Sequence, residues 1–123
     1  MRTILKTVKC DCSKLLYPTE DGESAALREG QWVEFKRKVT PGNMRMMLGF
    51  AQSAGAQDYG LLADGLDALS ALLARKIVAW NWTDLETGAA LPTPSIEVLN
   101  ELDFDDLLNL VNLYVETVFP SKN

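Results

Sequence analysis

The side chains best suited to chemistry in this sequence are two cysteines and several carboxylates, because histidine is absent. Cys10 and Cys12 form a Cys-Asp-Cys segment. A zinc site needs four ligands, and no other Cys or His exists to supply the remaining two. A disulfide between residues two apart would be strained. We therefore expect two reduced, partly buried thiols, with a redox or metal role across a subunit contact as the alternative.

The carboxylates form the second candidate group. The segment Asp84–Gly88 begins like a calcium-binding loop, but Ser95 stands at the twelfth position, where a bidentate Glu is needed. Asp103, Asp105 and Asp106 could bind a hard cation, although capping of a helix start is sufficient to explain them. Without histidine, a nucleophile has no usual general base, and no glycine-rich phosphate loop is present. The sequence predicts a protein that is not an enzyme and holds no metal or cofactor.

Charge is unevenly distributed along the 123 residues, whose formal net charge is −5. Residues 1–83 carry 11 basic and 9 acidic side chains, whereas residues 84–123 carry 1 basic and 8 acidic side chains. This asymmetry serves solubility or orients the molecule toward partners and copies of itself. An acidic chain is disfavoured for nucleic-acid binding. No apolar stretch approaches the length of a membrane span, and no signal peptide is evident, which predicts a cytoplasmic protein that binds no membrane.

The elements that must position these side chains are strands followed by helices. β-branched residues over 3–9 and alternation over 31–39 predict two strands that could pair antiparallel, separated by a loop over 17–24. Apolar residues at helical spacing predict helices at about 43–54, 59–78, 95–101 and 103–118. The length suits one domain over 1–123, with a β-rich part over 1–40 and a helical part over 41–119. The predicted fold class is α+β, mainly α-helical.

Two of these helices carry more apolar side chains than a single packing partner needs. Met46 and Met47 belong to a methionine-rich run that forms a soft, adaptable surface. Leu110 and Leu113 widen the apolar stripe of the last helix. One hypothesis places these four residues at a contact with a client or with another copy of the chain. The alternative is that they complete the chain's own core.

Trp80 and Trp82 fall on one face of an extended stretch that follows the second long helix. A tight reversal should follow over Asp84–Gly88, with Gly88 at a positive φ. We expect the two tryptophans to act as structural anchors that hold the turn over 80–91 against the helices.

Two segments resemble the tail assembly chaperones of long-tailed, siphophage-type bacteriophages. Residues 79–92, AWNWTDLETGAALP, are similar to that family's W-x-T/L-x-D-x-x-G-x-x-L-P element. Residues 30–37, GQWVEFKR, are similar to its G-x-W-V-E-(hydrophobic)-(basic)-(basic) strand. The short length, the β-then-α order and the acidic end also fit. The resemblance covers roughly residues 28–118 and leaves out the first 27 residues, which include both cysteines.

The resemblance implies a function in virion morphogenesis. Chaperones of this family bind the long, helical, apolar tape measure protein and keep it soluble until the tail tube polymerises around it. The implied partners are the tape measure protein, the tail tube protein and further copies of the chain. The implied location is the host cytoplasm, with no retention in the mature virion. The alternatives are a structural virion component, such as a head–tail connector or tail subunit, and a small acidic regulator that binds a host protein.

Overall fold

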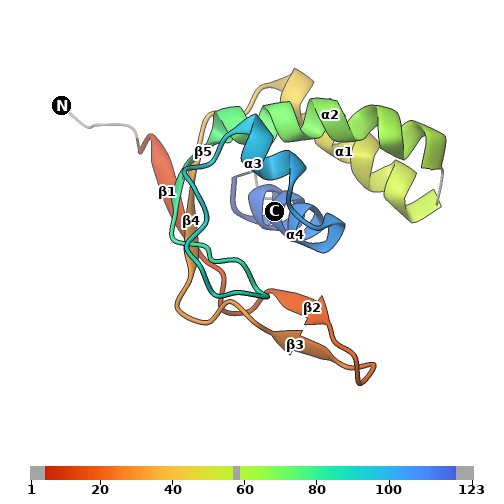
Figure 1. Ribbon diagram of the computed structural model, residues 1–123. Helices are drawn as coiled ribbons and strands as arrows, with labels where there is room; N and C mark the ends of the chain where they lie inside the picture. The colour runs from red at the N-terminus through yellow and green to blue at the C-terminus, as the bar shows by residue number, and fades with distance from the viewer. Residues whose placement is uncertain (1–4, 57–58, 119–123) are drawn as a thin grey trace.

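The computed structural model describes residues 5–56 and 59–118, and over residues 51–56 and 59–64 it describes the backbone alone. Four strands come first, followed by two long helices, a fifth strand and two further helices (Figure 1). The strands are β1 (Thr7–Asp11), β2 (Leu16–Pro18), β3 (Ser24–Ala26), β4 (Trp32–Lys36) and β5 (Ile77–Trp80). The helices are α1 (Pro41–Ala56), α2 (Tyr59–Lys76), α3 (Ile96–Asn100) and α4 (Phe104–Val118).

The expectation of a mainly α-helical fold is wrong. The described residues form five strands in two antiparallel sheets beside four helices, so that the fold is a small α+β fold. The unpredicted strands β2 and β3 have three residues each, which is too short to show an alternating pattern. β5 begins directly after the last residue of α2. In the sequence, Ile77 continues the helical spacing of the apolar residues before it, so the pattern predicted helix at this position. Helix and strand cannot be distinguished by periodicity over so few residues.

The larger sheet has the strand order β1-β4-β5, and its strands are antiparallel. β1 and β4 are the two strands predicted to pair, and β1 spans Thr7–Asp11. Residues 3 and 4 of the predicted strand over 3–9 lie outside the described residues. Alternation along β4 places Val33 and Phe35 in the core, both fully buried. β2 and β3 form a separate two-stranded hairpin, whose turn lies away from the helices (Figure 1). The Asn109 side chain of α4 donates to the Leu16 carbonyl of β2 at 3.0 Å.

Local signals set two of the helix starts. Thr40 and Asn43 exchange hydrogen bonds, because the hydroxyl of Thr40 accepts from the Asn43 N–H at 3.1 Å and the amide oxygen of Asn43 accepts from the Thr40 N–H at 3.2 Å. α1 therefore begins at Pro41, two residues before the predicted start. Ser95 caps α3 by accepting a hydrogen bond from the Val98 N–H at 3.3 Å.

The hydrophobic core draws on both the β-rich and the helical part of the chain. Phe35 of β4 meets Tyr114 of α4 edge to face, with ring centroids 5.2 Å apart. α4 lies on the side of the β1-β4-β5 sheet that faces the other helices (Figure 1). Other fully buried members of the same cluster come from α1, α2, α3 and α4, namely Met47, Leu69, Leu72, Leu73, Leu99 and Leu110.

Candidate functional site

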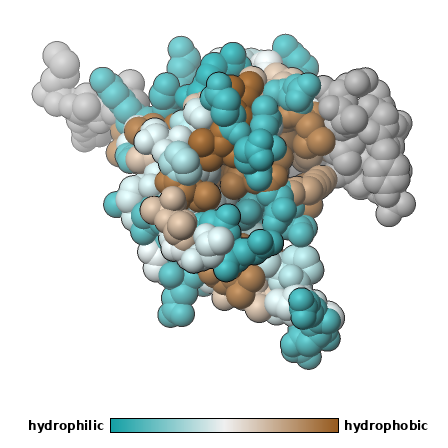
Figure 2. Space-filling view, viewed as in Figure 1, coloured by the Kyte–Doolittle hydropathy of each residue, from teal (hydrophilic) through white to brown (hydrophobic). Residues whose placement is uncertain are grey.

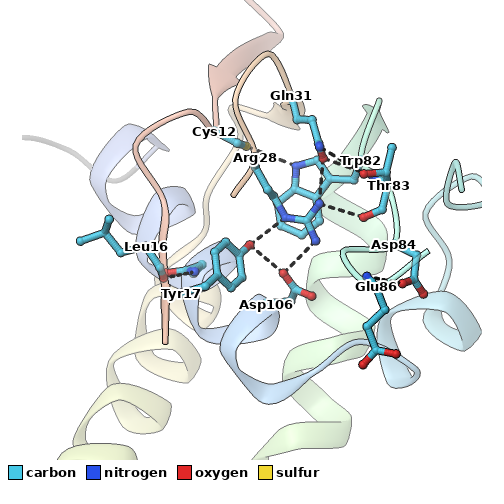
Figure 3. Close-up of polar contacts among 11 residues, drawn as sticks. Cys12, Leu16, Tyr17, Arg28, Gln31, Trp82, Thr83, Asp84, Glu86 and Asp106 are labelled. Carbon is cyan, nitrogen blue, oxygen red and sulfur yellow. Dashed lines mark hydrogen bonds and ion pairs between the residues drawn. The ribbon is translucent and has the colours of Figure 1, made fainter. Parts of the chain in front are cut away.

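Arg28 is buried to 1% exposure, a position in which a charged side chain needs partners. Its Nη2 lies 3.0 Å from Oδ1 of Asp106, in the first turn of α4. Its Nε donates to the hydroxyl of Tyr17 at 2.7 Å, and that hydroxyl donates to the same oxygen of Asp106 at 2.7 Å (Figure 3). The buried cation is therefore matched by a buried carboxylate and a shared hydroxyl.

The rest of the Arg28 guanidinium holds the segment that follows β5. Its Nη1 donates to the side-chain oxygen of Gln31 at 2.7 Å and to the main-chain oxygen of Thr83 at 3.0 Å. The guanidinium carbon lies 3.8 Å from the ring centroid of Trp82, a cation–π contact (Figure 3). Arg28 thus joins β2, α4 and the segment after β5, which are far apart in the sequence.

The two tryptophans expected to anchor the 80–91 turn lie at its base. Their rings stack with centroids 5.2 Å apart and an interplanar angle of 6°. The Trp80 indole N–H donates to the Pro92 carbonyl at 3.0 Å, so that the start and end of the segment are joined. The buried Trp82 places its indole N–H 3.3 Å from the sulfur of Cys12. We call residues 80–92 the tryptophan hairpin.

The tip of the tryptophan hairpin follows the predicted reversal. Gly88 has a φ of +76°, so the positive φ predicted for it is confirmed. Its N–H donates to the Asp84 carbonyl at 2.7 Å, and the Asp84 N–H donates to the Ala89 carbonyl at 2.8 Å. The Asp84 carboxylate accepts from the backbone N–H groups of residues 86 and 87, which explains this residue without a calcium ion.

A groove of about 480 Å³ lies between the tryptophan hairpin, α3 and the start of α4, with Arg28 and Asp106 in its wall. Six carboxylates and one cation line it, giving a formal charge of −5. The carboxylates belong to Asp84, Glu86, Glu97, Glu101, Asp103 and Asp106, and the apolar lining consists of Leu85, Leu91, Pro92, Val98 and Leu102. We call this feature the acidic groove. Such a lining suits a partner that is both cationic and partly apolar.

The two cysteines lie in the core rather than at the surface. Cys10 and Cys12 are buried free thiols. Burial raises the pKa of the Cys12 thiol to about 11, so that it stays a neutral thiol and a weak nucleophile near neutral pH. Among the side chains that the structure describes, no three of Cys, Asp or Glu lie close enough together to hold a metal ion.

The four residues proposed for a client or self-contact surface divide into two pairs. Met47 and Leu110 have 0% exposure, so the folded chain leaves neither available for contact, and both complete the core. Met46 and Leu113 are half-buried and pack against that core. The apolar surplus of these helices arises because sheet and helices cover them from more than one side. The sequence pattern shows the surplus but not which surfaces cover it.

Arg28 and the acidic groove were missed by sequence reasoning. Arg28 stands between exposed Leu27 and Glu29, in a stretch without regular structure. Its partner Asp106 is 78 residues away. In the sequence, Asp106 is indistinguishable from any other acidic residue in the first turn of a helix. The only available signal was the concentration of acidic residues after position 83, and this signal does not show that those residues line a groove.

No helix among the described residues combines the length and apolar character needed to cross a membrane. Comparisons of the chain with protein-family models, with curated proteins and with solved structures found no match.

Proposed function

We propose that this chain is a tail assembly chaperone of a long-tailed bacteriophage. In this function it binds the tape measure protein in the host cytoplasm and keeps it soluble until the tail tube polymerises. One observation carries the proposal: the two segments that resemble the family, residues 30–37 and 79–92, lie side by side although about 40 residues separate them in the sequence.

The contacts between the two segments involve fixed positions of the two patterns, namely Trp32, Val33 and Trp80, together with variable ones. Val33 of β4 pairs with Trp80 of β5. The Trp32 N–H donates to the side-chain oxygen of Asn81 at 2.7 Å. The Thr83 N–H donates to the side-chain oxygen of Gln31 at 3.1 Å. This contact is expected if both patterns belong to one structural unit shared with the family.

A chaperone for an apolar helical client needs accessible apolar side chains on a charged body. α1 supplies such a surface, because Leu48 is 51% exposed and Met44, one turn earlier on the same face, is half-buried. Phe104 leaves part of its ring exposed at the start of α4. We assign client contact to this outer surface of α1 and the start of α4.

The experiment is co-expression with the tape measure protein encoded in the same genome. We expect the chain to raise the soluble fraction of the tape measure protein and to copurify with it. Leu48→Glu should lower its affinity for the client by about 5- to 30-fold, since a central apolar contact contributes about 1–2 kcal/mol. Leu16→Glu is the matched control, because Leu16 is 57% exposed but lies on the separate β2–β3 hairpin.

Two results would count against the chaperone function, and a third would count against the assignment of client contact to α1. Recovery of the chain from mature particles in stoichiometric amounts would indicate a structural virion component. A stable complex with a host protein, without binding to the tape measure protein, would indicate a regulator. Equal loss of client solubility in the Leu48→Glu and Leu16→Glu variants would show that the effect is not specific to α1.

A further inference from the structure

A second surface of the molecule carries the opposite charge to the acidic groove. Four cations, Lys6, Lys36, Arg37 and Lys38, line a shallow hollow at the ends of β1 and β4. Leu5 and Val78 line the same hollow and are 63% and 42% exposed. We call this surface the basic face. Like the acidic groove, it combines charge of a single sign with accessible apolar side chains.

In the wall of the groove, Arg28 and Asp106 form a buried ion pair with each other. Within the described part of the chain, the other charged side chains of the two surfaces have no ion-pair partner within 4 Å. Beside the basic face, Lys76 donates to the Lys38 carbonyl at 2.8 Å. The pKa of Lys76 is lowered, first by burial and then by neighbouring cations such as Lys36. A surface that brought carboxylates to this face would relieve that repulsion.

The basic face and the acidic groove lie at opposite ends of β4. At the start of the strand, Trp32 and the preceding Gln31 bond to the tryptophan hairpin, which forms one wall of the groove. At its end, Lys36 belongs to the basic face. A five-residue strand separates its first and last residues by about 13 Å. One chain therefore cannot dock its basic face into its own groove.

We propose that the acidic groove of one copy binds the basic face of a second copy, so that copies join head to tail. The formal charges are opposite, −5 in the groove against four cations on the basic face. Each surface also offers apolar contacts, Leu85, Leu91 and Val98 in the groove and Leu5 and Val78 on the basic face. Hydrophobic residues on the face that carries α3 are bordered by hydrophilic ones (Figure 2).

A contact between two different surfaces leaves one of each free at the ends of a dimer. Further copies can add until the assembly closes into a ring or extends as a filament. The opposite charges also steer the encounter of two copies, and salt weakens that steering. The inference concerns the chain alone and does not depend on the identity of the client.

The first test is sedimentation velocity of the purified chain over a range of concentrations. At low salt, the average mass should rise with concentration and pass that of a dimer. Raising NaCl from about 50 mM to about 500 mM should lower the association constant by about tenfold or more, because the Debye length falls severalfold. A chain that stays monomeric at every concentration overturns the proposal.

The second test reverses charged residues on each surface. Lys36→Glu with Lys38→Glu takes the basic face from four positive charges to a net charge of zero, and Glu86→Lys with Glu101→Lys takes the groove from −5 to −1. Each double variant alone should associate much more weakly than the unmodified chain, because one of its two surfaces has lost nearly all of its net charge. An equimolar mixture should associate again, since the intact groove of the first variant can bind the intact basic face of the second.

Matched controls separate this effect from a general change of charge or a loss of folding. Glu20→Lys with Glu23→Lys alters two exposed carboxylates on the β2–β3 turn, away from both surfaces, and should associate as the unmodified chain does. Far-UV circular dichroism verifies that every variant is folded. Folded reversal variants that associate as strongly as the unmodified chain overturn the proposal. So does a monomeric chain whose groove binds a lysine-rich peptide, because the groove would then serve a foreign partner.

Discussion

Substituting Asp106 by Asn tests the buried network in the wall of the acidic groove. The change keeps the size of the side chain and an oxygen that can accept from Tyr17, but it removes the negative charge. The Arg28 guanidinium then stays buried at 1% exposure without a carboxylate partner. Breaking a buried ion pair on one side costs about 3–5 kcal/mol, because an uncompensated charge remains away from water.

This cost translates into a large change of melting temperature. Unfolding entropy near 60 °C is about 2.1 cal/mol/K per residue, so for 123 residues 1 kcal/mol corresponds to about 4 °C. We expect Asp106→Asn to lower Tm by about 12–20 °C. Asp105→Asn is the matched control, since Asp105 lies exposed in the same first turn of α4. Loss of its interaction with the helix dipole should cost under about 1 kcal/mol.

A double variant separates loss of the pair from exposure of a lone charge. Arg28→Met with Asp106→Leu removes both charges together and should be more stable than Asp106→Asn alone, although Gln31 and Thr83 lose a donor. Thermal and urea unfolding followed by far-UV circular dichroism measure all variants. The reasoning is refuted if Asp106→Asn melts within about 3 °C of the unmodified chain, or if the double variant is no more stable than Asp106→Asn.

Two further predictions concern the thiol beside Trp82 and the tip of the tryptophan hairpin. Burial raises the pKa of Cys12 from 9.0 to about 11, so the folded chain binds this proton more tightly and stability should fall between pH 9 and 11. Urea unfolding across this range should give a shallower pH dependence for Cys12→Ala; an unchanged slope would contradict the assignment. Gly88→Ala should cost about 1–2 kcal/mol, because φ is +76° although the space around Cα is open. Gly49→Ala, in a helix with equally open surroundings, should instead stabilise by up to about 1 kcal/mol, and equal effects at the two glycines in thermal unfolding would refute the backbone explanation.

Several elements of the fold could be predicted because their causes are local. Alternation along β4 placed Val33 and Phe35 on a buried face, and their burial follows from the period of two. Gly88 adopts a positive φ because few other residues do so at low cost. Ser95 caps α3 through a hydrogen bond to a residue three positions away. In each case the interacting atoms lie within a few residues.

The candidate site depended on contacts that no local pattern encodes. Arg28 is buried because Asp106 and Thr83, 78 and 55 residues away, are brought to its guanidinium by α4 and the tryptophan hairpin. The acidic groove exists because those same elements leave a gap lined by carboxylates from three segments. Met47 and Leu110 are in the core because neighbouring elements cover them. Sequence determines which residues are apolar, charged or turn-forming, whereas burial and pairing depend on which distant surfaces meet when the chain folds.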